Sequence, residues 1–307
     1  MASDTKPIVG WIGLGMMGWP MARHMVEAGY DVRVFDLRPE VSQRFAGEIG
    51  GEVAPTLEAL GATSDIVVTM VPDGKAARMA LVDGADNASK GMKKGAVAID
   101  MSSSEPTGTV ELGAALKEKG IMLCDAPVSG GTWRAEEGSL AIMLGGADAA
   151  ALDAAEAIME PMSRVVIRTG PLGSGHAMKC LNNYLSAIAL SATNEAILVG
   201  AKFGLDPSVM IDVINVSTGR SNNSETKFKP SVLTRKFDAG FATALMTKDV
   251  GIAAGLAESQ GQDMPILNLL TGIWREFNEA HPGSDHSAAI QYWEERNGET
   301  LEPTKQG

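Results

Sequence analysis

The chain has 307 residues, 45% of them apolar, and a formal net charge of −12 at pH 7. That length allows two domains, each with its own hydrophobic core. Acidic residues are spread along the sequence, so nucleic acids and anionic membrane surfaces, which both require a basic patch on their partner, are excluded as expected partners.

The cysteines and the N-terminal segment bear on location and metal binding. Cys124 and Cys180 have a spacing that fits neither a metal site nor a disulfide framework, so both are expected in the core. Residues 1–6 lack the apolar segment of a signal peptide, and the most apolar long stretch, 184–199, contains an asparagine and a glutamate. We therefore expect a cytoplasmic protein, or one of the matrix if the source is eukaryotic, with no metal ion and no membrane-spanning segment.

A glycine-rich turn lies between the first two predicted elements. Residues 8–12 form a short apolar run typical of a buried strand, and Gly13-Leu14-Gly15-Met16-Met17-Gly18 follows it directly. A helical pattern then extends to Gly29, and a second strand, 32–35, is followed by Asp36. This order of strand, G-x-G-x-x-G turn, helix, strand and acid is typical of dinucleotide-binding folds. The three glycines would allow a tight turn, the approach of a pyrophosphate to the backbone, and close helix–strand packing.

Asp36 determines the expected cofactor. Its carboxylate would accept hydrogen bonds from the adenosine ribose and repel a 2′-phosphate, which favours NAD over NADP. Arg38 lies two residues later and would be able to receive that phosphate. A solvated loop carboxylate is the alternative role for Asp36. We expect NAD as the cofactor and leave NADP open.

Strands and helices continue to alternate beyond this point. Short apolar runs predict further strands at residues 65–71, 96–100, 121–124, 140–144 and 165–167. The alternation predicts a doubly wound parallel sheet. Ligands bind such sheets beyond the carboxyl ends of the strands, where Pro72, Ser102, Ser103 and Ser129-Gly130-Gly131 fall.

The pattern changes after the turn-forming segment Thr169-Gly170-Pro171-Leu172-Gly173. From His176 to about Phe203, apolar residues recur at helical spacing, which corresponds to a helix of roughly 40 Å. Further helical patterns follow without a convincing strand. We therefore predict a Rossmann domain over residues 1–170 and an all-helical domain over 171–307, joined by the long helix.

Three polar side chains lie near the start of this long helix. Lys179, Asn182 and Asn183 are spaced by three and four residues, so they share one face. A cation and two amides are costly to bury unless they meet polar groups, which favours a substrate at this face. On spacing alone, the alternative for Lys179 is a surface lysine whose stem lies along the helix. His176 is interpreted as a polar residue of the helix start rather than as a ligand contact.

Four motifs together resemble the β-hydroxyacid dehydrogenases, the family typified by 3-hydroxyisobutyrate dehydrogenase. They occur in the family's order and span nearly the whole chain, at Gly13 to Ala22, Asp125 to Gly131, Gly173 to Asn183 and Leu245 to Asp249. The resemblance implies a Rossmann domain joined by a long helix to an all-α domain, in agreement with the pattern above. It also implies hydride transfer between NAD(P) and a small 3-hydroxy acid or the matching semialdehyde.

The resemblance further implies a role for each matching position. Lys179 matches the catalytic lysine, and Asn183 matches an amide that contacts the substrate. Ser129 and Gly130, with Gly131, match the turn that holds the substrate carboxylate. The implied cofactor contacts are Val71, Pro72 and Ser103 at the nicotinamide end, and Lys248 from the helical domain.

Some of these positions depart from the family or allow another interpretation. Ser103 stands where threonine is usual and keeps the hydroxyl, and Val71 stands where leucine is common. Lys248 lies beside Asp249, so a solvated ion pair is the alternative to a cofactor contact.

Trp133-Arg134 stands where relatives have small apolar residues. The Arg134 guanidinium suits a second anionic group on the substrate. The alternative is a surface ion pair of Arg134 with Glu136 or Glu137.

These residues have the chemistry for alcohol oxidation. Lys179 would take the hydroxyl proton as a general base, or return it in the reverse direction, while backbone N–H groups of the serine–glycine turn would hold a carboxylate. Two other functions stay open: an imine reductase of the same overall fold, disfavoured by Lys179, and a nicotinamide-binding module without turnover. The glycine- and alanine-rich helices of the second domain predict a homodimer or homotetramer.

Overall fold

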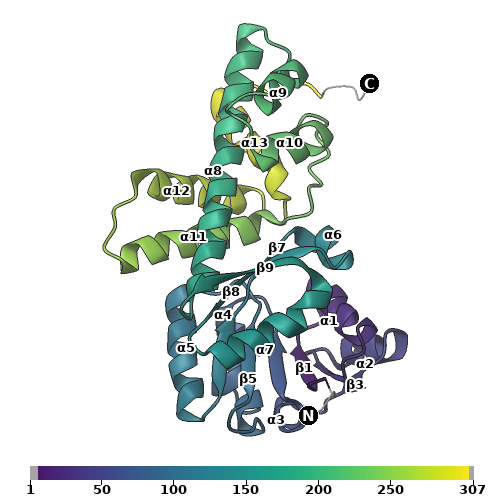
Figure 1. The fold of residues 1–307 in the computed structure, drawn as a ribbon. Helices are drawn as coiled ribbons and strands as arrows, with labels where there is room; N and C mark the ends of the chain where they lie inside the picture. The colour runs from purple at the N-terminus through teal and green to yellow at the C-terminus, as the bar shows by residue number, and fades with distance from the viewer. Residues whose placement is uncertain (1–5, 304–307) are drawn as a thin grey trace. The chain divides into compact units, whose positions relative to one another are not determined.

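The computed structural model describes residues 6–303, whose contacts form two compact units (Figure 1). The first unit extends to Lys179 and the second begins at Cys180. This division falls inside helix α8 (Ser174–Phe203), whereas the sequence analysis places the domain change at residues 170 and 171, ahead of that helix. Each unit has its own buried apolar core.

The first unit is built on one sheet, which has nine strands within residues 6–303. They are β1 (Val9–Ile12), β2 (Val32–Phe35), β3 (Glu52–Val53), β4 (Ile66–Thr69), β5 (Val97–Asp100), β6 (Met122–Asp125), β7 (Val128–Ser129), β8 (Leu140–Gly146) and β9 (Ser163–Gly170). Their order is β3-β2-β1-β4-β5-β6-β8-β7, with β9 paired to β8. Strands β1 to β6 pair in parallel, whereas β8 runs antiparallel to β6 and β7. The order of the first six strands confirms the predicted Rossmann domain.

Both faces of the sheet are buried because alternate side chains of each strand meet different helices. On β4, Ile66 and Val68 join one core cluster and Val67 joins the other. The first cluster includes side chains of α1, α2 and α7, and the second includes side chains of α3 and α5 (Figure 1). The helices of this unit are α1 (Gly18–Glu27), α2 (Pro39–Glu48), α3 (Leu57–Thr63), α4 (Gly74–Arg78), α5 (Pro106–Glu118), α6 (Gly131–Glu136) and α7 (Ala149–Met159), with short η1 (Met79–Asp83), η2 (Ala88–Lys90) and η3 (Glu160–Met162).

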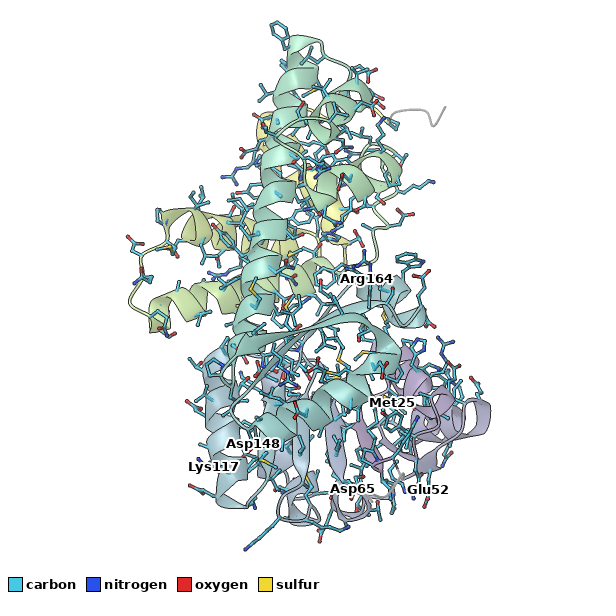
Figure 2. The ribbon with its side chains drawn as sticks, viewed as in Figure 1. Met25, Glu52, Asp65, Lys117, Asp148 and Arg164 are labelled. Atoms are coloured by element: carbon cyan, nitrogen blue, oxygen red, sulfur yellow. The ribbon has the colours of Figure 1, made fainter. Side chains whose placement is uncertain are left out.

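The charged side chains labelled in Figure 2 lie at the surface of this unit. Met25 of α1 is fully buried in the first cluster. The charged residues labelled in Figure 2 are all exposed: Glu52, Asp65, Lys117, Asp148 and Arg164.

The second unit is helical, as predicted. Its elements are the rest of α8, then α9 (Pro207–Asn215), α10 (Asn222–Thr226), η4 (Phe228–Val232), α11 (Thr243–Ser259), α12 (Pro265–Ala280), η5 (His286–Ala289) and α13 (Ile290–Asn297). Leu267, Leu270, Trp274 and Phe277 recur on one face of α12 and are all buried. The short α10 and η4 have no amphipathic repeat and were not predicted from the sequence.

Helix α8 is long and apolar enough to cross a membrane by length and composition, with a mean hydropathy of 1.3 in its most apolar window. The core helix of a soluble protein satisfies the same criteria, and Ala187, Leu190 and Ile197 of α8 lie in the core of the second unit. The expected absence of a membrane-spanning segment therefore stays a prediction.

A buried polar cluster lies in the second unit, at the start of α11. The Lys227 Nζ lies 2.9 Å from the His286 Nε2, and the His286 Nδ1 lies 2.9 Å from the carbonyl oxygen of Phe241. The Asp285 carboxylate accepts hydrogen bonds from the N–H groups of Gly240 and Phe241 at 2.8 and 2.9 Å. Burial lowers the pKa of Lys227 from 10.5 to about 8, although the charge of Asp285 opposes this shift.

This pKa predicts how unfolding depends on pH. The folded-state pKa of Lys227 is below its unfolded value, so the unfolded chain binds more protons between about pH 8 and 10.5. The contribution of Lys227 to the free energy of unfolding should therefore rise across that window, by an amount on the order of 3 kcal/mol at most. Urea unfolding of the native chain and of Lys227→Met at several pH values measures this difference. A difference that is flat, or that falls as the pH rises, would contradict the prediction.

Candidate active site

The glycine-rich turn has the geometry that a dinucleotide requires. Gly13 has a φ of +98°, and a Cβ there would lie 2.3 Å from the carbonyl oxygen of Met70. A Cβ on Gly18 would lie 2.1 Å from the carbonyl oxygen of Gly13, so both positions exclude any side chain. A Cβ on Gly15, in contrast, would meet no atom within 4 Å. The turn therefore packs tightly at its two ends and is open in the middle, where a ligand would approach the backbone.

Helix α1 begins at this turn with no side chain capping it, since Met17 occupies the N-cap position. Uncapped N–H groups at a helix start favour an anion, so this end of α1 fits a pyrophosphate.

Asp36 is the acid at the end of β2, and it holds the glycine-rich turn. Its carboxylate accepts hydrogen bonds from the N–H groups of Leu14 at 2.9 Å and Arg38 at 3.0 Å. Burial alone would raise the pKa of Asp36, but these bonds and the Arg38 guanidinium lower it, so the carboxylate is ionised at neutral pH. Arg38 itself is largely exposed, with its Nε 3.2 Å from the Asp36 carboxylate. The geometry places both a carboxylate and a guanidinium at this position.

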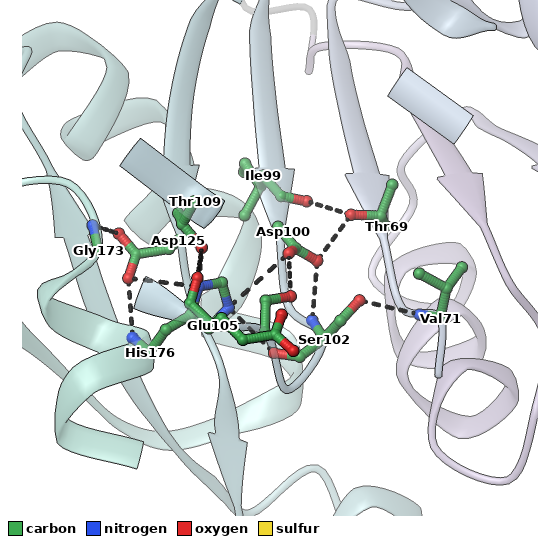
Figure 3. A network of polar contacts seen from close by, with 11 residues as sticks. Thr69, Val71, Ile99, Asp100, Ser102, Glu105, Thr109, Asp125, Gly173 and His176 are labelled. Atoms are coloured by element: carbon green, nitrogen blue, oxygen red, sulfur yellow. Dashed lines mark hydrogen bonds and ion pairs between the residues drawn. The ribbon is translucent and has the colours of Figure 1, made fainter. Parts of the chain in front are cut away.

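A network of buried polar contacts lies at the carboxyl ends of β4, β5 and β6 (Figure 3). The Asp100 carboxylate accepts hydrogen bonds from the Thr69 hydroxyl at 2.9 Å, the Ser102 N–H at 3.0 Å and the Ser104 hydroxyl at 2.7 Å. The Ser102 hydroxyl oxygen in turn accepts from the N–H of Val71 at 3.0 Å. This network fixes the backbone on either side of Pro72 and Ser103, the residues that the sequence analysis places at the nicotinamide.

Asp125, the last residue of β6, caps helix α8. Its carboxylate accepts hydrogen bonds from the N–H groups of Gly173 and His176, both at 2.8 Å. These are donors at the start of α8 that the helix itself cannot satisfy, and a buried anion is favoured there by the helix dipole. The second turn of the same helix carries Lys179. Asp125 thus joins the segment leading to Ser129 to the helix that carries Lys179.

Two glycines allow this close approach of helix and sheet. A Cβ on Gly175 would lie 2.3 Å from the carbonyl oxygen of Met143 and 2.9 Å from the Asp125 carboxylate. A Cβ on Gly145 would lie 2.4 Å from the same carboxylate. The start of α8 therefore rests directly on β8 and on the end of β6.

The serine–glycine turn forms as predicted and leads into the short helix α6, which was not predicted. Ser129 ends β7, and Gly130 and Gly131 have φ values of +141° and +69°, which only glycine adopts readily. The side chain of Arg134 folds back beside Gly130, where a Cβ would lie 2.7 Å from the Arg134 Cδ. Among residues 6–303, Arg134 forms no ion pair, and Glu136 pairs with Arg23 at 3.2 Å instead.

Lys179 and Asn183 lie on successive turns of α8, Lys179 in the first unit and Asn183 in the second. Lys179 is half-buried and Asn183 is buried. The Asn183 Nδ2 donates to the Asp249 carboxylate at 2.5 Å, and its Oδ1 accepts from Asn182 at 3.3 Å. Lys248 lies 4.0 Å from the same Asp249, so the ion pair weighed as an alternative for Lys248 is present at the limit of ion-pair distance.

Sequence reasoning missed the roles of Asp100, Asp125 and Asp249 as hydrogen-bond acceptors. Asp125 and Asp249 fall inside the motifs, but nothing in their spacing indicates the groups they hold. In the sequence, Asp100 is recognisable only as the acid that ends a predicted strand. Cys124 and Cys180 are buried free thiols, as predicted, and burial raises the pKa of each to about 12.

Family models match both halves of the chain. Residues 8–170 match the NAD binding domain of 6-phosphogluconate dehydrogenase. Residues 173–293 match a model described as the NAD-binding domain of NADP-dependent 3-hydroxyisobutyrate dehydrogenase.

Three relatives show similarity over nearly the whole chain. Mitochondrial 3-hydroxyisobutyrate dehydrogenase of Mus musculus is 35% identical over 302 residues, covering 96% of this chain and 89% of the relative. 2-(Hydroxymethyl)glutarate dehydrogenase of Eubacterium barkeri is 33% identical over 291 residues, covering 94% of this chain and 96% of the relative. The structure of Mycobacterium tuberculosis 3-hydroxyisobutyrate dehydrogenase with L-serine has a TM-score of 0.87 and 32% identity, covering 94% of this chain and 99% of that one.

Proposed function

The chain belongs to the β-hydroxyacid dehydrogenase family, and we propose that it oxidises a small 3-hydroxy acid with NAD(P), or reduces the matching semialdehyde. The observation that carries this proposal is the capping of α8 by Asp125. It holds the helix that carries Lys179 against the strand that leads into Ser129. The relatives described above are hydroxyacid dehydrogenases, so neither imine reduction nor cofactor binding without turnover is favoured.

The chain's own residues fit a nicotinamide cofactor. The turn from Gly13 to Gly18 would hold the pyrophosphate, and Asp36 would hold the adenosine ribose. Val71, Pro72 and Ser103 would flank the nicotinamide, and Lys248 would approach the cofactor from the helical domain. When bound, the cofactor supplies the hydride acceptor of oxidation or the hydride donor of reduction.

We assign the substrate contacts to two segments. The N–H groups at Ser129-Gly130-Gly131 hold the substrate carboxylate without adding a charge. The Lys179 Nζ takes the hydroxyl proton in oxidation and returns it in reduction, and its charge stabilises the alkoxide. Asn183 orients the lysine and the substrate oxygen, with its own amide held by Asp249.

Residues 1–170 would then serve as the cofactor domain and 171–307 as the substrate and assembly domain. A cytoplasmic location and a homodimer or homotetramer stay part of the proposal.

A panel of substrates tests the proposed function. The absorbance of reduced nicotinamide is followed with 3-hydroxyisobutyrate, glycerate, threonate and 2-(hydroxymethyl)glutarate, each with NAD and with NADP. Lactate, a 2-hydroxy acid, and a cyclic imine with the reduced cofactors are the controls. Turnover of at least one 3-hydroxy acid is expected, whereas turnover of the imine alone would contradict the proposal.

Arg134 is expected to select substrates with a second anionic group. Its position beside Gly130, without an ion pair in the part of the chain that the structure describes, leaves its charge available there. Arg134→Ala should raise the KM for 2-(hydroxymethyl)glutarate by about tenfold, the loss of roughly one charge-assisted hydrogen bond, and leave the KM for 3-hydroxyisobutyrate within about twofold. Arg134→Lys, which keeps the charge, is the matched control. An equal effect on both substrates, or on neither, would overturn this role.

A further inference from the structure

Two buried carboxylates lie side by side in the first unit. Asp100 and Asp125 are register partners on the neighbouring parallel strands β5 and β6, and they are only 1% and 0% exposed. Asp100 accepts hydrogen bonds from three donors and Asp125 from two. Two neighbouring buried carboxylates are costly unless a positive charge lies close by.

The His176 ring is the group that reaches both carboxylates (Figure 3). Its Nε2 lies 3.8 Å from the Asp100 carboxylate and its Nδ1 lies 3.8 Å from the Asp125 carboxylate. The side chain is fully buried, so solvent does not screen its interaction with the two carboxylates. Within residues 6–303, Asp100 and Asp125 are the charged groups paired with this ring.

The hydrogen bonds of the ring place a proton on the Nε2 and are compatible with a second proton on the Nδ1. The Nε2 lies 3.0 Å from the Ser102 carbonyl oxygen, which only accepts, so the Nε2 donates. The Nδ1 lies 2.8 Å from the Thr109 hydroxyl oxygen, and that hydroxyl donates to the carbonyl oxygen of Glu105 at 3.0 Å. Because a hydroxyl has one hydrogen, the Nδ1 donates to Thr109 in the arrangement in which the Thr109 hydroxyl donates to Glu105.

We propose that His176 is a positioning residue, held as an imidazolium between Asp100 and Asp125, which locks the start of α8 to the loop after β5. The inference rests on the proposed function, because that loop carries Ser103 and α8 carries Lys179.

Ser102 is the residue of the loop after β5 that His176 contacts. Its N–H is held by Asp100, its hydroxyl oxygen by the Val71 N–H, and its carbonyl oxygen by His176. His176 is the one of these three partners that comes from α8. The imidazolium therefore fixes how far the nicotinamide loops lie from the first turn of the helix that carries the proton-handling lysine.

Ring nitrogen shifts of the native chain test the charge directly. ¹⁵N-labelled protein is followed by histidine-ring NMR between about pH 5.5 and 8.5, the range in which an ordinary histidine titrates. The His176 signals are identified by their loss in His176→Gln. Two protonated ring nitrogens across the whole range are expected. A neutral ring at about pH 7.5 would overturn the proposal.

A double-mutant cycle tests whether the charge stabilises the fold. His176→Gln keeps a donor for Ser102 but removes the cation, and it should lower the Tm by about 5 °C or more. Adding Asp100→Asn removes one of the two anions, so the double variant should regain about half of the lost Tm. Strictly additive losses would overturn the bridging role. His24→Gln is the matched control, because His24 also bonds a backbone carbonyl, at 3.0 Å, but lies near one carboxylate, that of the exposed Glu27, instead of two buried ones. Its Tm loss should be clearly smaller than that of His176→Gln.

Steady-state kinetics test the positioning role. His176→Gln should lower kcat about tenfold or more, since a small misplacement of reacting groups is costly, and leave the KM for NAD within about twofold. If His176→Gln lowers the Tm but leaves kcat unchanged, the cluster has a structural role only, and the positioning role of His176 is overturned. NMR and Tm are read without substrate, so they remain decisive even where the substrate panel fails.

Discussion

Lys179→Ala is expected to lower kcat by about a thousandfold or more while the Kd for NAD stays within a fewfold. The lysine lies near the capped start of α8, and its removal would take away the proposed proton acceptor and the charge proposed to stabilise an alkoxide. The proposed cofactor contacts of the glycine-rich turn and Asp36 would be untouched. Stopped-flow or steady-state turnover, together with fluorescence titration of the reduced cofactor, measures the two quantities separately.

Two variants make the result specific. Lys179→Arg keeps the positive charge but cannot lose its proton, so it should remain at least about a hundredfold slower than the native chain. Lys202→Ala removes a lysine from the last turn of the same helix, where it is exposed and pairs with Glu299, and it should leave kcat unchanged. A Lys179→Ala variant that keeps more than about a few per cent of native turnover would remove Lys179 from the mechanism.

Gly175→Ala is expected to lower the free energy of unfolding by about 2–4 kcal/mol. The added Cβ would lie 2.3 Å from the carbonyl oxygen of Met143, a backbone atom of β8 that cannot rotate away. Either α8 shifts outward and stretches the hydrogen bonds to Asp125, or the strand moves. Both outcomes change the position of Lys179 relative to the sheet, so kcat should fall as well. Urea unfolding and turnover of the same preparation measure both effects.

Gly255→Ala is the matched control for this substitution. Gly255 lies within α11, and a Cβ there would meet no atom within 4 Å. Alanine is the better helix former, so this variant should gain about 0.5–1 kcal/mol of stability. Equal free energies of unfolding for the two variants would show that the start of α8 packs less closely against β8 than the structure indicates.

The Rossmann fold was predictable from the sequence because its signals are local. The glycine-rich turn, the strands before and after it, and the acid at residue 36 lie within about 30 residues, the size of one βαβ unit. The long helix was predictable from its apolar spacing, and the structure begins it at Ser174, close to the predicted His176. The short α6 and α10, at 6 and 5 residues, are too brief to show a helical repeat and were missed.

The partners of the site residues were not predictable, because they lie far apart in the sequence. Asp125 is 48 and 51 residues from the amides it holds, and His176 is 74 residues from Ser102. His176 was interpreted as a polar residue of the helix start. It does lie there, but it faces inward between two carboxylates, which only the pairing of β5 with β6 brings together.

The carboxylate of Asp125 also changes which backbone amides of α8 exchange with solvent. A helix end normally frays, and its first amide protons exchange within moments because nothing inside the helix holds them. The amides of Gly173 and His176 are instead bonded to a side chain that is itself fully buried. The rate of their deuterium uptake should therefore be limited by the opening of the strands and not by fraying of the helix end. The lysine proposed to handle the proton would thus lie near the end of α8 whose amides exchange most slowly. Thermal motion would displace its side chain least there.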